Sequence, residues 1–163
     1  MEKERLKFCI GRFDHYYESI NNKSAVFLGL STFVVGGLVA AYPTVLSLVN
    51  CSLFVHLNML SVIGLGIASM IIVIIASTPF LSKSTESMLY FGSISCMTKE
   101  QYHVKSGTVC SEEDELIDLR TQVHQLSCGL AYKFKQLKLA GTLITIQFCL
   151  FIPLILLIVC NLK

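Results

Sequence analysis

Two long stretches of the chain contain no charged residue. Lys, Arg, Asp and Glu are absent from Ser24 to Ser82 and again from Gly141 to Leu162. A helix of about 20 apolar residues crosses the hydrocarbon core of a bilayer, so the first stretch is long enough for two spans and the second for another. This pattern predicts three membrane-spanning helices, over 24–49, 52–77 and 137–160.

The first two predicted spans are separated only by the polar residues Asn50 to Ser52. Such a short break predicts that the two spans form a tight hairpin. Pro43 lies near the end of the first span. Because proline lacks a backbone N–H and clashes with the preceding turn, we expect it to kink or end the helix there.

The segment 3–22 has the spacing of an amphipathic helix. Its apolar residues recur three and four positions apart, with Glu, Lys, Arg and Asp between them. These apolar residues are Leu6, Ile10, Phe13, Tyr17 and Ile20. We expect this helix to lie either on the membrane surface or against another cytosolic helix.

Residues 78–136 form a polar connection that contains a second long helix. Ser111 followed by Glu112, Glu113 and Asp114 is typical of a helix start, because the hydroxyl caps the first turn and the acids favour its positive end. No proline follows until Pro153. The helix from 112 is therefore expected to continue directly into the third span. The fold class is an all-α membrane protein, with 1–163 forming a single unit.

This long helix carries an apolar seam over about three heptads. The seam residues are Leu116, Leu119, Val123, Leu126 and Leu130. One interpretation is an antiparallel pairing with 3–22 of the same protomer. The other is self-association between protomers, which makes the seam an oligomer contact.

Basic residues predict the orientation of the spans. The N-terminal segment has five Lys and Arg, the connection between the first two spans has none, the long connection together with Lys138 at the start of the third span has seven, and the tail has one. By the positive-inside rule, the N-terminus and 78–136 lie in the cytosol and the C-terminus lies outside.

The composition argues against several function classes. Charged residues make up 15% of the chain and the net charge is +2, whereas soluble domains carry about 25% charged residues. The charge is too small for a nucleic acid polymer as partner, and membrane lipid is the expected surrounding. No nucleophile, phosphate-loop or metal-ligand pattern is visible. We therefore expect no enzyme activity, no metal and no cofactor.

Small and polar residues within the spans leave two interpretations open. Gly36 to Ala41, and Gly64 with Ala68, allow close helix approach, either within one protomer or between protomers. His56 and Asn58 lie near the outer end of the second span, where they belong either to the membrane interface or to a water path.

The segment Tyr90-Phe91-Gly92 is neither a span nor a simple helix. Two adjacent rings followed by glycine would let a ring stack on a flat ligand while the backbone comes close to it. The alternative is a loop that anchors its rings in the protein or at the membrane interface.

The order of these features resembles the transmembrane effectors of the bacterial Pycsar anti-phage defence family. That family begins its first span with a D-x-K-A sequence, where this chain has Asn21 to Ser24, so that Lys23 matches while the Asp and Ala do not. After the second span the family has a Pro and then an aromatic-Phe-Gly-x-Ile motif, matched by Pro79 and by Tyr90 to Ile94. Glu100 to Tyr102 then matches a Glu-x-Tyr element.

The resemblance continues into the last helix, where Gln122, Leu126 and Lys133 lie in the register of the family pattern. It implies that a cyclase senses phage infection and makes a cyclic pyrimidine mononucleotide, cUMP or cCMP. The effector would bind this messenger, oligomerise and impair the cell inner membrane, which stops growth by abortive infection.

The resemblance also suggests a ligand-binding site in the cytosolic part. Base stacking would fall to Tyr90, Phe91 or Tyr102, and the phosphate would meet Lys99, Arg120, Lys133 or backbone amides near Gly92. The rival hypotheses are a small accessory subunit of a membrane transporter or channel and a ligand-independent pore.

Overall fold

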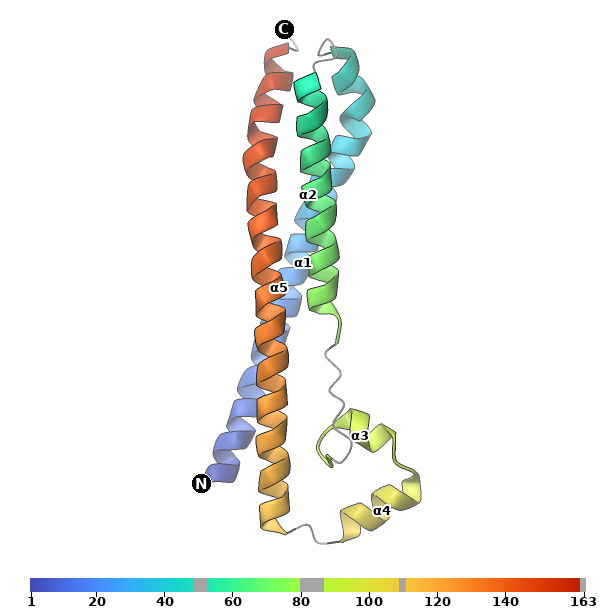
Figure 1. Cartoon of the computed structure of the whole chain (residues 1–163), viewed down its shortest axis with the longest axis vertical. Helices are drawn as coiled ribbons and strands as arrows, with labels where there is room; N and C mark the ends of the chain where they lie inside the picture. The colour runs from blue at the N-terminus through green and yellow to red at the C-terminus, as the bar shows by residue number, and fades with distance from the viewer. Residues whose placement is uncertain (49–52, 80–86, 109–110, 162–163) are drawn as a thin grey trace. The chain divides into compact units, whose positions relative to one another are not determined.

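The structure, a computed structural model, describes residues 1–48, 53–79, 87–108 and 111–161. Within these ranges every regular element is a helix (Figure 1). The elements are α1 (Glu2–Leu48), α2 (Leu53–Ser77), α3 (Phe91–Ser95), α4 (Lys99–Gly107) and α5 (Glu112–Asn161). Three of these helices, α1, α2 and α5, are long and apolar enough to cross a membrane. The predicted all-α membrane fold with three spans is confirmed.

Helix α1 joins two predicted elements, because the amphipathic segment 3–22 and the first span form one helix of 47 residues. The sequence between them contains no proline or glycine that would interrupt the backbone. The helix also continues through Pro43 to Leu48, so the proline does not end it. The predicted turn at Asn50 to Ser52 lies outside the described residues.

Helix α5 has 50 residues and begins where the acidic sequence predicts. The Asp114 backbone N–H donates to the Ser111 hydroxyl at 3.2 Å, and the Ser111 backbone N–H donates to the Asp114 carboxylate at 3.2 Å. This reciprocal capping satisfies amides that have no partner inside the helix. From there the helix passes without interruption into its apolar half, as predicted.

The chain divides into two compact units. Unit 1 comprises Met1–Ser19 and Pro79–Tyr132, and unit 2 comprises Ile20–Thr78 and Lys133–Lys163. Unit 1 therefore holds most of the predicted connection together with the charged start of α1. Unit 2 holds the described parts of the three predicted spans.

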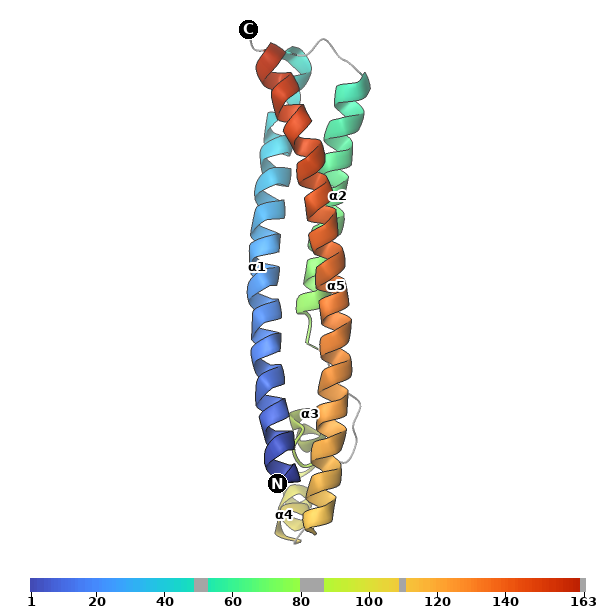
Figure 2. The same ribbon diagram turned by 90° about the vertical axis from the view of Figure 1, so that its left-hand side faces the viewer.

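In unit 1 the start of α1 lies along the start of α5, and the two helices run in the same direction (Figure 2). Lys3 contacts Glu115, while Tyr17, further along α1, donates its hydroxyl to the Leu126 carbonyl at 2.9 Å. The predicted antiparallel pairing of 3–22 with this helix is therefore wrong. Successive spans alternate in direction, so the first and third spans of one chain must run parallel.

In unit 2 the three helices lie side by side around an apolar core (Figures 1 and 2). The core residues are Val34, Leu38 and Val45 of α1, Val55, Met59 and Val62 of α2, and Leu154 of α5. At Gly66 a Cβ atom would collide with Val35 of α1 and would lie 2.5 Å from Gln147 Nε2 of α5. The absence of a side chain at Gly66 is therefore what lets the three helices meet.

The glycines that the sequence analysis names as possible close contacts, Gly36, Gly37 and Gly64, lie in a more open environment than Gly66. Gly36, Gly37 and Gly64 have no described atom within 4 Å of the place where a Cβ would be. Ala41, from the same predicted segment, packs against the apolar core within the chain, whereas these three glycines do not mediate close helix approach in the described part of the chain. Their role between protomers stays a prediction.

Candidate functional site

A short segment of unit 1 is held against α5 by side-chain hydrogen bonds. The buried Ser87 hydroxyl accepts from Gln122 Nε2 at 2.9 Å and from the backbone N–H groups of Leu89 and Tyr90 at 3.1 and 3.0 Å. The Met88 N–H donates to the Asp118 carboxylate at 2.9 Å. Because Asp118 and Gln122 are four residues apart, they share one face of α5. We call these six contacting residues, Ser87, Met88, Leu89, Tyr90, Asp118 and Gln122, the loop clamp.

The loop clamp places the aromatic motif at the start of α3. The rings of Tyr90 and Phe91 are tilted, with centroids 5.0 Å apart. A Cβ on Gly92 would lie 2.5 Å from Tyr90 Cε1, so the glycine makes room for the ring of Tyr90. The Phe91 side chain, in contrast, is 67% exposed. Of the two rings, Phe91 therefore offers more surface to a ligand.

Two further candidate residues lie on α4. Thr98 caps this helix in a reciprocal arrangement with Gln101. Lys99 and Tyr102, in the first turn, are both exposed. Being three positions apart on a helix, they present a cation and a ring on the same side.

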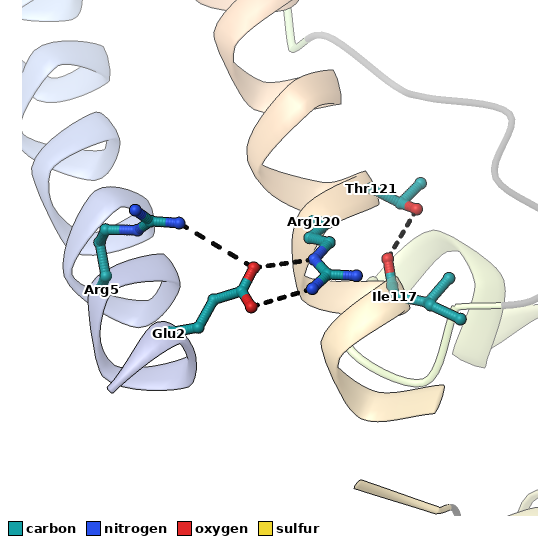
Figure 3. A network of polar contacts seen from close by, with 5 residues as sticks. All are labelled: Glu2, Arg5, Ile117, Arg120 and Thr121. Atoms are coloured by element: carbon teal, nitrogen blue, oxygen red, sulfur yellow. Dashed lines mark hydrogen bonds and ion pairs between the residues drawn. The ribbon is translucent and has the colours of Figure 1, made fainter. Parts of the chain in front are cut away.

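Arg120 binds a carboxylate in the described structure (Figure 3). Its Nε and one terminal nitrogen each donate to an oxygen of Glu2 at 2.9 Å, and Arg5 lies 3.9 Å from the same carboxylate. A planar guanidinium fork suits carboxylate and phosphate equally. Arg120, which the sequence suggests as a phosphate contact, therefore binds the N-terminal turn of α1 in this structure.

A second ion pair lies beside the first. Lys3 Nζ donates to Glu115 at 2.6 Å. The bond from Arg120 lowers the pKa of Glu2, the bond from Lys3 lowers the pKa of Glu115, and the pKa of Lys3 is raised in return. The side chains of Glu2, Lys3 and Glu115 are 38%, 32% and 37% exposed, so solvent screens both pairs and each pair adds little to stability.

These pKa directions predict how pH affects the attachment of α1 to α5 in unit 1. The carboxylates of Glu2 and Glu115 stabilise this attachment fully when the pH is above their ordinary pKa. The stabilisation is lost as the pH falls through their lowered pKa values. Lys3 contributes below its ordinary pKa and loses that contribution as the pH rises through its raised value. The attachment is therefore expected to be tightest between about pH 5 and pH 10.

Spin labels at Phe8→Cys and Ile117→Cys, both exposed positions, would measure this attachment. The distance distribution should broaden on acidification from pH 7 to about pH 2, because the lowered pKa values of Glu2 and Glu115 require a pH well below the ordinary carboxylate value for protonation. A chain that also carries Glu2→Gln and Glu115→Gln serves as the control and should be broad already at pH 7. An unchanged distance distribution in acid would contradict the role of these two ion pairs in attaching α1 to α5.

Lys133 belongs to unit 2, whereas the other candidate residues belong to unit 1. It is 4% exposed, and its Nζ donates to the Ala76 carbonyl at 2.8 Å. The last carbonyls of a helix have no partner within the helix, so Lys133 satisfies one of them at the end of α2. Lys133 therefore has a structural role that the sequence does not reveal.

Replacing Lys133 tests this structural role. Lys133→Met keeps much of the apolar stem but leaves the buried Ala76 carbonyl without its donor, and should cost about 1–3 kcal/mol of unfolding free energy. Lys135→Met, at an exposed position two residues further on, is the matched control and should be nearly neutral. Thermal denaturation in detergent would measure both, and equal melting temperatures would contradict the role.

The seam residues are partly covered within their own chain. Leu119 and Leu130 are buried, whereas Leu116, Val123 and Leu126 are half-buried. Leu6 of α1 is buried in the same unit. The start of α1 thus accounts for part of the coverage, and an oligomer contact at this seam stays a prediction.

The sequence does not identify Ser87 and Asp118 as site residues. Gln122 appeared only as a position in the family register, without a role. No local pattern marks the three residues, since Ser87 and Gln122 are 35 positions apart. Among the described residues, no group of three or more His, Cys, Asp or Glu side chains is arranged to hold a metal ion.

Comparison with known proteins identifies the family. The sequence profile described as the Pycsar effector protein domain matches residues 5–160. No curated protein and no solved structure shows significant similarity to the chain. Since the profile match covers nearly all of the 163 residues, the chain belongs to the Pycsar effector transmembrane family of anti-phage defence proteins.

Proposed function

We propose that the protein is an inner-membrane effector that a cyclic mononucleotide, cUMP or cCMP, activates to oligomerise and impair the membrane. In this proposal the N-terminus and 78–136 lie in the cytosol and the C-terminus lies outside. The protein is not an enzyme and needs no cofactor. Its partners are membrane lipid, the messenger and further copies of itself, without any nucleic acid polymer.

One observation carries the ligand site: Phe91 is largely exposed next to a segment that hydrogen bonds hold to α5. A base stacked on an aromatic ring gains about 1–3 kcal/mol, and a ring positioned in advance loses little entropy on binding. Lys99 and Arg120 belong to the same unit and supply the cations for a phosphate. Arg120 would exchange the carboxylate of Glu2 for the phosphate.

The route from ligand to membrane runs through α5. The loop clamp contacts α5 at Asp118 and Gln122, and the same helix continues to Asn161. A ligand shifts such an equilibrium only as far as it binds one state better than the other. The open surfaces at Gly36, Gly37 and Gly64 are suited to close contact with a second copy.

Dye-loaded liposomes that contain the full-length protein would test the proposal. Cyclic UMP, cyclic CMP, cyclic AMP and a cyclic dinucleotide are added in turn, and one of the two pyrimidine nucleotides is expected to trigger release. Phe91→Ala should raise the half-maximal concentration at least tenfold, in line with the loss of about 1–3 kcal/mol of stacking. Val104→Ala, at a similarly exposed apolar position of α4, is the control and should have no effect.

The other outcomes would overturn the proposal. Release without any nucleotide would favour a ligand-independent pore. Folded protein that releases no dye under any condition would favour a small accessory subunit of a transporter or channel.

A further inference from the structure

A depression on the surface of α5 lies where the helix changes from charged to apolar residues. It has a volume of about 380 Å³ and is lined by Lys135, Gln136, Lys138, Leu139 and Thr142. Gln136 is half-buried and the other four residues are exposed. This surface, which we call the α5 depression, therefore combines two cations and an amide with an apolar side chain.

The α5 depression lies on the outside of the three-helix bundle of unit 2. Lys135, Lys138 and Thr142 follow one another at spacings of three and four, so they share one side of the helix. The buried residues of the same stretch recur with the same spacing on another side. These residues are Lys133, Leu137, Ala140, Ile144 and Gln147. The α5 depression thus faces away from the interior of the bundle, toward the surrounding lipid.

The length of the uncharged part of α5 sets the depth of the α5 depression in the membrane. Lys138 is the last charged residue of this helix, and from Leu139 to Asn161 the helix is about 34 Å long, close to the ~30 Å hydrocarbon thickness. A charge inside hydrocarbon is costly, so α5 leaves the hydrocarbon at Lys138. Lys135 lies about 4.5 Å further out along the helix, at the depth of the lipid headgroups.

Helix α1 gives the same depth independently. A Cβ on Gly141 would lie 3.3 Å from the ring of Phe27, so α1 and α5 meet at this level. The two helices run in the same direction here, since Val35 of α1 and Gln147 of α5 meet again further along, at Gly66 of α2. Lys23, exposed and directly before the first uncharged stretch, precedes Phe27 by about one turn, as Lys138 precedes Gly141. Both helices therefore place the membrane surface at the same level.

The two lysines of the α5 depression have no acidic partner within the described ranges. The ion pairs found there involve neither Lys135 nor Lys138. Asp118 is the last acidic residue of the chain and lies about 25 Å along the helix from Lys135. Lys133, in contrast, is buried and donates to the Ala76 carbonyl. Lys135 and Lys138 are therefore available to an anion at the membrane surface.

We propose that the α5 depression binds the phosphate headgroup of an anionic phospholipid, in the leaflet at the N-terminal end of the third span. Lys135 and Lys138 meet the phosphate as compact point charges, and basic pockets at this depth suit anionic headgroups. Gln136 supplies an amide donor, and Leu139 lies against the start of an acyl chain. The Thr142 hydroxyl already donates to the Lys138 carbonyl at 3.0 Å, so it is not a donor for the phosphate.

A soluble phosphate, inorganic or nucleotide, would present the same chemistry to the two lysines. A lipid is favoured because the α5 depression opens on the lipid-facing side at headgroup depth. It also contains an apolar side chain, Leu139, which a soluble phosphate would leave uncovered. In the orientation proposed above, this leaflet is the cytosolic one.

Native mass spectrometry of the full-length protein in a neutral detergent would count the lipids that each chain retains. Phosphatidylglycerol and phosphatidylcholine are added at equal concentrations, and phosphatidylglycerol is expected to bind at least tenfold more tightly. A lysine close to an anionic surface contributes about a fivefold gain in affinity. Lys135→Gln together with Lys138→Gln should therefore lose at least tenfold in affinity for phosphatidylglycerol. Lys135→Arg together with Lys138→Arg keeps both charges and should keep the binding.

The matched control is Lys7→Gln together with Lys105→Gln, which removes the same charge from exposed positions of unit 1. This control should retain phosphatidylglycerol like the unmodified chain. Equal binding in the two Gln double variants would overturn the site, because net charge alone would then attract the lipid. Displacement of the lipid by inorganic phosphate or by cyclic UMP would also overturn it, because the site would then bind soluble phosphate.

The lipid site and the proposed function fail in different ways. A chain that does not select phosphatidylglycerol but releases dye with a pyrimidine nucleotide would overturn the lipid site alone. A chain that selects the lipid but responds to no nucleotide would overturn the proposed trigger alone.

Discussion

Gly66→Val is expected to destabilise the protein by about 2–3 kcal/mol or more, since atoms forced into a packed interior displace their neighbours. The added side chain would collide with Val35 of α1 and with Gln147 of α5 at the same time. Neither helix can move away without opening the core. In a bilayer, where apolar side chains gain nothing by leaving lipid, close packing of this kind is what holds helices together.

Gly64→Val provides the matched control for this prediction. Gly64 is two residues away on the same helix, and no described atom lies within 4 Å of its Cβ position. Both changes alter helix propensity in the same way, so the difference between them reports packing alone. Thermal denaturation of the two variants in one detergent measures it, and equal melting temperatures would show that the helices do not meet at Gly66.

Gln122→Leu is expected to abolish the response to the nucleotide, or to raise its half-maximal concentration at least tenfold. Gln122 is 6% exposed and supplies one of the hydrogen bonds that hold Ser87. Without it the segment that carries Tyr90 and Phe91 loses a link to α5. A ring that must be ordered on binding costs affinity, even though the ring itself is unchanged.

Two measurements separate this effect from general misfolding. Hydrogen exchange at the Leu89 and Tyr90 amides, which donate to Ser87, should accelerate in Gln122→Leu while the unit 2 helices stay protected. Thr121→Val is the control, because among the described residues the Thr121 hydroxyl donates to the Ile117 carbonyl of its own helix. A Gln122→Leu chain that responds to nucleotide like the unmodified protein would contradict a role for the loop clamp in the site.

The sequence predicts the elements that depend on local patterns. Uncharged length predicts the three spans, and the Ser111 to Asp114 sequence predicts the start of α5. Each of these signals acts within a few residues or along a single helix. Local patterns also divide α1 wrongly into two predicted elements, because the composition changes from polar to apolar along it. Such a change does not break the backbone, and the helix is continuous.

Only the tertiary structure decides which polar groups meet across the fold. Ser87 with Gln122, Lys133 with Ala76, and Gln147 with Gly66 are pairs from distant parts of the chain. Composition alone does not distinguish Gly66 from Gly64, or Lys133 from Lys135. The difference lies in which neighbour stands within a few ångströms, and that depends on how each helix is rotated about its axis against the others.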